Sequence, residues 1–463
     1  MADKKGRSRF WHDVSVRSVK LLNILFITFP FAFLLVTYYS KQAYGGELGT
    51  YGNAAVIVLY VFAYSILVRI YDAFQISKVS RLELFFCQII TLALTDAVFY
   101  ILLTIIIRAL PDIFIFIVCI ISQLIISYFW CLIVSWWYFK AFKKRNAVII
   151  YDSIHNLNEI AKHDQFQKSF ELMGVYDIDE VKKAPKSERD RWLIDKIKDA
   201  EVVFVMEINS HERNVVIKYC VENSISCYDE PKIGDILMMT SRQFNMYNLP
   251  IVLIERFSPA PEYMLIKRLS DIFLASLALA VTSPVLLFTA LAVKITDGGP
   301  VIYKQKRLTK DGRIFEIYKF RSMRIDAEKF TGAVLSSGKD DPRVTKIGRF
   351  IRKVRIDELP QLINIIKGDM SIVGPRPERP EIAEQYCKVL PEFRLRLQVR
   401  AGLTGYAQVY GRYDSDPYDK LSMDLYYISK AGFAQDLKIM FVTIKRILAK
   451  EPEFHVEDPD DDF

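Results

Sequence analysis

Four long apolar segments occupy most of the first 140 residues of this chain. They span residues 21–40, 48–68, 84–107 and 113–139, and the third alone contains a charged residue, Asp96. Each segment approaches or exceeds the roughly 20 residues that a helix needs to cross a bilayer. The pattern therefore predicts a multi-pass membrane protein with a four-helix transmembrane bundle over residues 21–140.

The charges between these segments predict the orientation of the bundle. Lysine and arginine are concentrated before the first segment (residues 1–20), between the second and third, and after the fourth. By the positive-inside rule, the N-terminus and everything that follows the bundle then face the cytoplasm. The first segment is too long for a signal peptide and no small-residue cleavage site follows it, so we expect no cleavable signal.

Asp96 lies near the middle of its segment, where an ionisable group is costly. We expect it to be neutral or paired within the bundle, and Asn23, Gln123 and Tyr100 are candidate partners by residue type. A structural role in the bundle or at a dimer interface is favoured over catalysis.

A fifth apolar segment, residues 272–293, contains Ser283 and Pro284 at its centre. Proline removes a backbone donor, so we expect a break there, with the freed carbonyls bonded to Ser283, Thr282 or neighbouring helices. Each half would be about 15–18 Å long, against a hydrocarbon core of about 30 Å. The segment is either a kinked span or a re-entrant hairpin over residues 264–296, and the hairpin keeps the rest of the chain on the cytoplasmic side.

Residues 146–257 alternate between short apolar runs and amphipathic segments. Strands are predicted at 147–151, 171–176, 202–206 and 225–228, and helices at 187–199 and 211–222, which indicates a small α/β domain with a parallel sheet. No glycine-rich loop follows the first strand, where a dinucleotide-binding domain has its GxGxxG motif. We therefore expect a degenerate Rossmann-like domain that packs, dimerises or regulates, and a homodimer stays open.

The next region is strongly basic. Between residues 301 and 355 there are 16 lysines and arginines and 6 acids, so this segment carries +10, whereas the whole chain carries +8. Such a concentration predicts a surface for a polyanion. The six cysteines form no CxxC pair, so neither a zinc site nor a disulfide framework is indicated.

Two adjacent carboxylates, Asp357 and Glu358, follow this basic segment. A helix is expected to begin there, because Pro360 suits a first turn and apolar residues then recur at helical spacing. The helix N-terminus and Arg355 should favour the ionised carboxylates. No histidine lies between residues 301 and 450, so histidine-assisted nucleophilic catalysis is excluded in this region. Either one carboxylate attacks while the other holds a metal, or both merely complement the helix dipole.

Three motifs together resemble a known family. Residues 355–362 (Arg-Ile-Asp-Glu-Leu-Pro-Gln-Leu), 374–377 (Gly-Pro-Arg-Pro) and 402–408 (Gly-Leu-Thr-Gly-Tyr-Ala-Gln) resemble the bacterial polyprenyl-phosphate sugar-1-phosphate transferases, the large monotopic phosphoglycosyltransferases. The resemblance covers about the last 200 residues closely. It implies an α+β catalytic domain over residues 297–450 and a Ser-Pro-broken re-entrant helix before it.

The resemblance also implies a reaction and its location. Asp357 is expected to attack the sugar-bearing phosphate of a UDP-sugar, releasing UMP, and undecaprenyl phosphate then accepts the hexose 1-phosphate. Glu358 is expected to bind Mg²⁺, which prefers oxygen ligands. Such transfer is the first membrane step of exopolysaccharide, capsule or O-antigen synthesis at the bacterial inner membrane. Membrane lipids are expected partners, and nucleic acid is not.

Further substrate-binding residues follow from the same motifs. Lys319 and Arg321 alternate with Phe320, so both can share one face of a strand and contact phosphate, although a solvated basic edge would look the same. The resemblance assigns Pro375, Arg376 and Pro377 to the nucleotide. The complete expected set is Lys319, Arg321, Arg355, Pro375, Arg376, Pro377, Asp424 and Asp436.

Residues 344–355 have an apolar side and a basic side. That pattern predicts an amphipathic helix at the membrane interface, although a helix packed on the domain core would look alike. Departures from the family pattern, such as Ala401 and Tyr406, bear on the choice of sugar more than on the chemistry. The tail, residues 451–463, has seven acids and is expected to be disordered.

Two other function classes stay open at this point. One is a lipid-linked glycosyltransferase that releases UDP, and the other is a non-enzymatic membrane scaffold in which the carboxylates only cap a helix.

Overall fold

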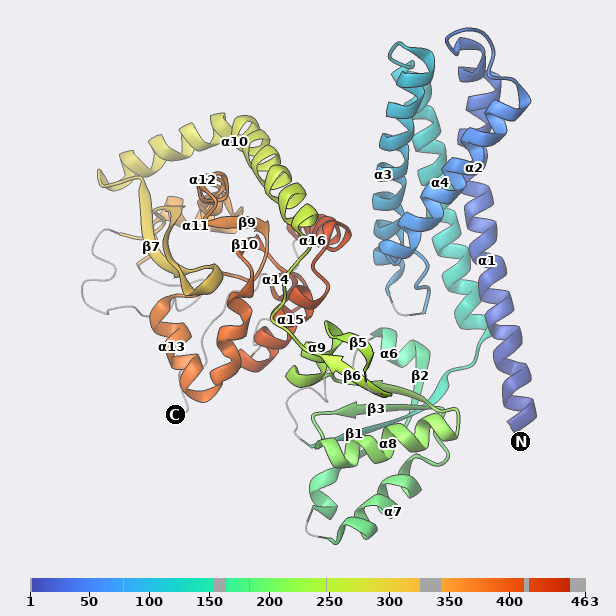
Figure 1. Ribbon diagram of the computed structural model, residues 1–463. Helices are drawn as coiled ribbons and strands as arrows, with labels where there is room; N and C mark the ends of the chain where they lie inside the picture. Colours follow the sequence, from blue (N-terminus) through green and yellow to red (C-terminus); the bar gives the residue numbers. More distant parts are fainter. Residues whose placement is uncertain are drawn as a thin grey trace. The chain divides into compact units, whose positions relative to one another are not determined.

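The computed structural model describes residues 2–77, 79–152, 164–182, 184–246, 248–324, 343–411 and 416–449 (Figure 1). The expectation for the tail at 451–463 lies outside the described residues. The chain divides into two units, Met1–Glu230 and Pro231–Phe463. The second unit therefore begins before residue 257, where the sequence placed the end of the α/β domain.

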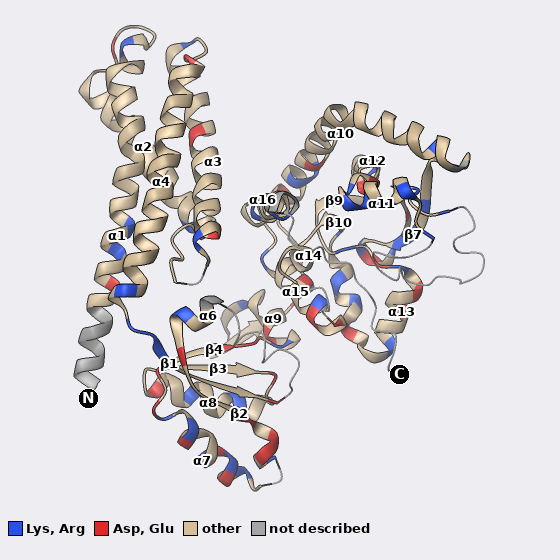
Figure 2. Ribbon diagram, turned by 180° about the vertical axis from the view of Figure 1, so that it is seen from behind, with Lys and Arg blue, Asp and Glu red and all other residues tan. Residues whose placement is uncertain are grey.

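Four long helices form the bundle of the first unit: α1 (Ala2–Thr37), α2 (Gly49–Ile70), α3 (Arg81–Ile107) and α4 (Ile113–Ala141). A short 3-10 helix, η1 (Tyr39–Gln42), follows α1. Each of the four predicted apolar segments lies within one of these helices or its flanking turn. Together with α10 (Pro261–Asp297) of the second unit they are the five described helices that are long and apolar enough to cross a membrane. Figure 2 shows that Lys, Arg, Asp and Glu are sparse along most of their length.

The centre of the bundle holds a buried polar network. Asp96 is 1% exposed and accepts a hydrogen bond of 2.8 Å from the Tyr60 hydroxyl, which in turn accepts one of 2.8 Å from Gln123. Gln123 therefore reaches Asp96 through Tyr60, a residue that the sequence did not single out. The other two candidates bind elsewhere, because Asn23 accepts from Tyr64 and Tyr100 donates to a backbone carbonyl.

A parallel sheet completes the first unit, with strand order β2-β1-β3-β4. Its strands are β1 (Arg145–Tyr151), β2 (Phe170–Asp177), β3 (Val202–Met206) and β4 (Ser226–Asp229), and its helical segments are α6 (Asp164–Ser169), η2 (Ile178–Val181), α7 (Lys186–Ile197) and α8 (Ser210–Glu222). All four predicted strands and both predicted helices are present. Buried residues of β1 and β3 pack against Leu193 of α7 and Val216 of α8.

The second unit begins with α9 (Ile233–Met239) and the antiparallel hairpin of β5 (Arg242–Met246) and β6 (Leu249–Leu253). Ile236 of α9 is buried with Val373 and Leu421, which lie much later in the chain. Residues that the sequence assigned to the α/β domain thus contribute to the core of the second unit.

The long helix α10 (Pro261–Asp297) follows and changes direction within its length (Figure 1). Pro284 lies inside it, and the Ser283 hydroxyl donates a 2.7 Å hydrogen bond to the carbonyl of Ala280, the group that the missing proline N–H leaves free. Thr282 donates similarly to Ala278. The predicted compensation by Ser283 is confirmed, whereas the predicted break is a bend in one continuous helix.

The remaining elements form an α+β domain. They are β7 (Ile302–Leu308), η3 (Lys310–Gly312), β8 (Ile314–Phe320), α11 (Lys346–Lys353), η5 (Ile356–Glu358), α12 (Gln361–Lys367), β9 (Met370–Val373), α13 (Pro380–Val389), η6 (Pro391–Gln398), β10 (Ala401–Thr404), α14 (Tyr406–Tyr410), α15 (Pro417–Ser429) and α16 (Phe433–Ala449). β7 pairs antiparallel with β8, and β9 pairs parallel with β10. Leu362 and Ile365 of α12 are buried between Ala275 of α10 and Phe315 of β8, which fixes the segment carrying the two carboxylates.

Helix α11 packs on the domain core and also exposes apolar side chains, so both interpretations of its sequence pattern apply. Ile351 is buried against Phe320 and Val293, so one edge of the apolar side packs on the domain core. Phe350 and Val354 are exposed, so the other edge is available to a membrane surface.

Candidate active site

Asp357 and Glu358 lie in a single 3-10 turn between α11 and α12. The sequence predicted that the helix itself begins at this pair, but α12 begins at Gln361, with Pro360 as its N-cap. Arg355 causes the difference, because it has a left-handed backbone (φ 55°) that ends α11 and starts a tighter turn. The turn presents both side chains ahead of the helix.

Three cations surround the Glu358 carboxylate. Lys319 Nζ lies 2.8 Å from one oxygen, Arg376 lies 3.6 Å from the same oxygen, and Arg355 lies 4.0 Å from the other. They come from the end of β8, from the loop after β9 and from the turn itself. Burial alone would raise the pKa of Glu358, but these cations outweigh it and hold that pKa well below its usual range.

Asp357 has the opposite electrostatic environment. It is buried, and burial together with the neighbouring Glu358 raises its pKa to about 6, although Lys319 and Arg352 partly offset the rise. The prediction that both carboxylates would be stabilised in their ionised form thus fails for Asp357, because burial was invisible in the sequence. Adjacent acids with pKa values pushed apart can perform different tasks.

The Gly-Pro-Arg-Pro loop is held by hydrogen bonds to its backbone carbonyls. Pro375 O accepts from Gly402 N at 2.8 Å and Pro377 O accepts from an Arg307 guanidinium nitrogen at 3.0 Å. A Cβ on Gly374 would lie 2.3 Å from the carbonyl oxygen of Arg400, so only glycine allows this close approach. The loop and the Gly-Leu-Thr-Gly motif therefore lie side by side, and Arg376 projects from a fixed backbone.

Arg376 also borders a cavity of about 880 Å³. Its other walls include Pro375, Thr309, Phe393 and Val399. The same arginine thus connects the carboxylate pair to a space large enough for a small-molecule ligand.

Asp424 lies behind this loop and not beside Asp357. It is buried and pairs at 2.7 Å with Arg396, whose guanidinium also donates to the carbonyl of Arg376 at 2.9 Å and lies 3.4 Å from Glu378. Burial raises the pKa of Asp424 to about 6, and Arg396 offsets only part of that rise. Asp424 thus supports the Gly-Pro-Arg-Pro loop through Arg396, a residue that sequence reasoning missed.

Asp436 is also away from the carboxylate pair. It accepts hydrogen bonds from Tyr263 and Tyr427, each at 2.8 Å, and pairs with Lys267 at 2.6 Å, which ties α16 to the first turns of α10. Arg321 is buried directly after β8, with 8% of its surface exposed. Of the predicted residues, the structure brings Lys319, Arg355 and Arg376 to the Asp357–Glu358 pair.

Comparison with known proteins gives a consistent result. The model of a family described as bacterial sugar transferase matches residues 262–450. A UDP-N-acetylgalactosamine-undecaprenyl-phosphate N-acetylgalactosaminephosphotransferase of Aeromonas hydrophila is 44% identical over 193 residues, which are 41% of this chain and 45% of that protein. A UDP-glucose:undecaprenyl-phosphate glucose-1-phosphate transferase of Escherichia coli K12 is 40% identical over 220 residues, 46% of this chain and 47% of that protein.

The match thus spans about half the length of these two relatives. A shorter relative, an exopolysaccharide production protein of Rhizobium leguminosarum bv. phaseoli, is 39% identical over 199 residues, which are 41% of this chain and 99% of that protein. The part of the chain that matches this shorter relative therefore corresponds to almost the whole of that protein.

Proposed function

This chain belongs to the bacterial sugar transferase family, and on that premise we propose that it transfers a hexose 1-phosphate from a UDP-sugar to undecaprenyl phosphate. The acceptor agrees with the names of two relatives. The observation that carries the proposal is the pair of adjacent carboxylates, Asp357 and Glu358, within a ring of three cations. Phosphoryl transfer needs this combination of a positioned nucleophile and cations for the phosphate charge.

We propose a two-step reaction through Asp357. An oxygen of its carboxylate attacks the phosphorus that bears the sugar, the bond from that phosphorus to the bridging oxygen breaks, and UMP leaves with the bonding electrons. A phosphosugar then remains covalently attached to Asp357. A phosphate oxygen of undecaprenyl phosphate attacks the same phosphorus and releases the carboxylate, so each step exchanges one P–O bond for another.

The surrounding cations bind and orient the donor. Lys319 and Arg376 converge on the carboxylate pair from separate segments, and they supply positive charge where the diphosphate must lie. Arg376 also borders the adjacent cavity, so it is placed to hold the donor between that cavity and Asp357. We assign the nucleotide to this side of the site.

We propose Mg²⁺ as the cofactor, with Glu358 as its protein ligand. Magnesium usually binds through one or two carboxylates plus substrate phosphates, and not in an all-protein cage. The described residues contain no group of three or more His, Cys, Asp or Glu side chains that could hold a metal, and the ionised Glu358 fits the mode in which phosphates complete the coordination. When bound, the ion neutralises part of the diphosphate charge. Activity should then be lost on chelation and restored by added magnesium.

We propose that α10 enters the membrane and returns, so that the catalytic domain lies on the cytoplasmic side. We also propose that the reaction there is the first membrane step of exopolysaccharide, capsule or O-antigen assembly. The bend of α10, its Pro284 and its many exposed apolar side chains support this membrane arrangement. Single cysteines at Lys267 and Lys294 should both react with a membrane-impermeant reagent from the cytoplasmic side. Reaction from opposite sides would establish a true span.

The test of the proposed function is the identity of the released nucleotide. Purified protein in detergent is incubated with undecaprenyl phosphate and, in parallel, UDP-glucose, UDP-galactose or UDP-N-acetylgalactosamine. The transferase releases UMP with at least one donor, and Asp357→Asn abolishes the release while Asp369→Asn, a change in a partly exposed ion pair with Arg313, does not. Release of UDP would indicate a glycosyltransferase, and no nucleotide release with any donor would favour a scaffold.

A further inference from the structure

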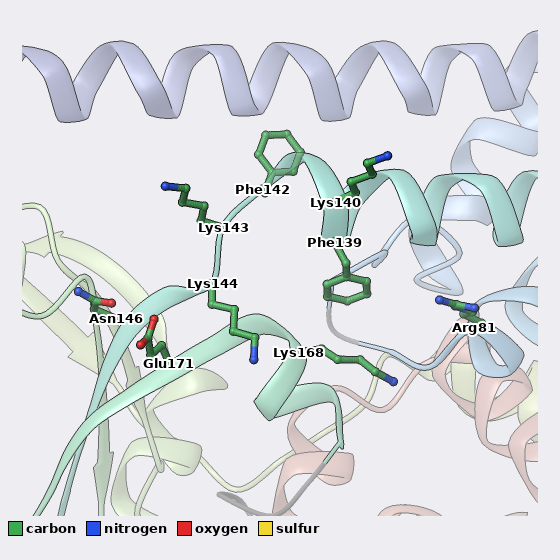
Figure 3. A pocket seen from close by; sticks show the side chains of 9 residues that line it. All are labelled: Arg81, Phe139, Lys140, Phe142, Lys143, Lys144, Asn146, Lys168 and Glu171. Atoms are coloured by element: carbon green, nitrogen blue, oxygen red, sulfur yellow. The ribbon is translucent and has the colours of Figure 1, made fainter.

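A basic cavity lies in the first unit, where the bundle meets the parallel sheet (Figure 3). Its volume is about 660 Å³, and its walls come from the end of α4, the start of α3, the turn before β1, the start of β1, α6 and the start of β2. None of these elements belongs to the matched transferase region at residues 262–450. The cavity is therefore separate from the candidate active site in sequence and in structural unit.

Five cations and one carboxylate line this cavity. The cations are Arg81, Lys140, Lys143, Lys144 and Lys168, and the carboxylate is Glu171. Figure 3 shows Arg81 and Lys168 pointing toward one another across the space beside Phe139. An excess of four positive charges in one concave site attracts an anion.

Four of these cations form no ion pair with a carboxylate among the described residues: Arg81, Lys140, Lys143 and Lys144. Arg81 instead donates to the Ser135 hydroxyl at 3.2 Å, and Lys140 lies over the Trp136 ring at 4.6 Å. The positive charge of these four side chains is therefore available to a ligand.

The position of the cavity along α4 indicates which kind of anion it meets. The apolar part of α4 ends at Trp136, Trp137 and Tyr138, directly before the lysines, and Trp136 is 57% exposed. Tryptophan and tyrosine followed by lysine is the arrangement found at the level of lipid head groups. Phe139 and Phe142 add apolar surface to the cavity wall. Cations beside apolar rings at this level suit an amphiphile with an anionic head.

We propose that this cavity binds the phosphate of an anionic membrane lipid, with a phospholipid head group as the source. Arg81, Lys144 and Lys168 contact the phosphate, Lys140 and Lys143 line the cavity around it, and the phenylalanine rings contact the start of the acyl region. Basic pockets beside transmembrane helices bind phospholipid head groups in this way. The lipid would thereby link the bundle to the sheet, because the cations come from both.

The test uses the full chain purified in a neutral detergent. Binding of phosphatidylglycerol is measured by native mass spectrometry or by the shift in thermal unfolding, with phosphatidylcholine as the zwitterionic comparison. Each cation near a lipid surface contributes about 1 kcal/mol, or about fivefold in affinity, so Lys144→Gln/Lys168→Gln should weaken phosphatidylglycerol binding about 30-fold. Lys186→Gln/Lys218→Gln removes the same charge from exposed positions on α7 and α8 and should change binding less than twofold.

The charge-retaining pair Lys144→Arg/Lys168→Arg separates loss of binding from loss of folding, because it should bind phosphatidylglycerol like the parent. Equal binding by the cavity and control variants, or equal binding of phosphatidylcholine, would overturn the proposal.

Two competition experiments address the source of the phosphate. Displacement of the lipid by millimolar inorganic phosphate would assign the site to a soluble anion. Tighter binding of undecaprenyl phosphate than of phosphatidylglycerol would assign it to the acceptor lipid, and either result would overturn the phospholipid source.

Discussion

Asp436→Asn should loosen the junction between α10 and α16 without touching the carboxylate pair. Both oxygens of Asp436 accept hydrogen bonds, one from Tyr427 and the other from Tyr263 and Lys267. An asparagine presents one acceptor oxygen and turns an N–H₂ group toward donors, so at least one of these bonds is lost and the lysine loses its counter-ion. A hydrogen bond to a charged group contributes about 1.5–3 kcal/mol, so the combined loss should be about 3 kcal/mol.

Hydrogen exchange measured by mass spectrometry can locate this loss. Tryptophan fluorescence would not, because all five tryptophans lie in the first unit. A change of about 3 kcal/mol in local opening should speed exchange about 100-fold in peptides from α16 and from the first turns of α10. Peptides from the parallel sheet should be unchanged.

The matched control is Asp369→Asn, which removes a carboxylate from a pair with Arg313, whose side chain is 60% exposed. An exposed pair contributes about 0–1 kcal/mol, so exchange should rise about fivefold at most. If Asp436→Asn and Asp369→Asn agreed within threefold, the anchoring role of Asp436 would be refuted. A selective rise in the KM for the donor with unchanged exchange would instead support the substrate-binding role that the family resemblance implies.

Three further predictions concern the carboxylate pair. The pKa of Asp357 is raised to about 6, and the nucleophile must be ionised. UMP release in the absence of acceptor and at saturating magnesium should therefore fall about tenfold between pH 7 and pH 5. A flat pH profile would contradict the assignment of Asp357 as the nucleophile. Glu358→Gln should lower activity through its loss as a magnesium ligand, and because it removes a neighbouring negative charge, the acid limb of its residual UMP release should have a midpoint at lower pH; Glu316→Gln on β8 should leave the midpoint in place. Lys319→Gln should lower the rate of UMP release on the order of 100-fold, as expected for loss of one charge-stabilising donor; a change below threefold would exclude Lys319 from phosphate stabilisation.

Local patterns in the sequence were sufficient to predict much of the fold. Strands such as β3 follow from short apolar runs between amphipathic helices, and the bonding of Ser283 to the Ala280 carbonyl follows from the chemistry of proline. The pattern could not show which helix faces reach one another. For that reason Tyr60 was missed as the partner of Asp96, since it is one of several tyrosines on apolar helices.

Part of the geometry of the candidate site was predictable. The sequence shows that Asp357 and Glu358 are adjacent and follow a basic segment, and their catalytic roles stay predictions. The order of their pKa values depends on burial and on Arg376, which comes from a separate loop. The substrate-binding roles of Asp424 and Asp436 stay predictions, and the motifs did not reveal their ion-pair partners, Arg396 and Lys267. Arg396, the buried partner of Asp424, has an ordinary alternating context on η6 that gives no signal of its role.

The most direct test of the account is a search for the covalent intermediate on Asp357. The full chain is incubated with a UDP-sugar donor in the absence of undecaprenyl phosphate, quenched, digested and examined by peptide mass spectrometry. We expect a hexose phosphate on the peptide that contains Asp357 and one equivalent of UMP released per modified chain. The modification should be lost on addition of acceptor and be absent from Asp357→Asn. Turnover that leaves Asp357 unmodified, or undiminished turnover by Asp357→Asn, would contradict the covalent mechanism.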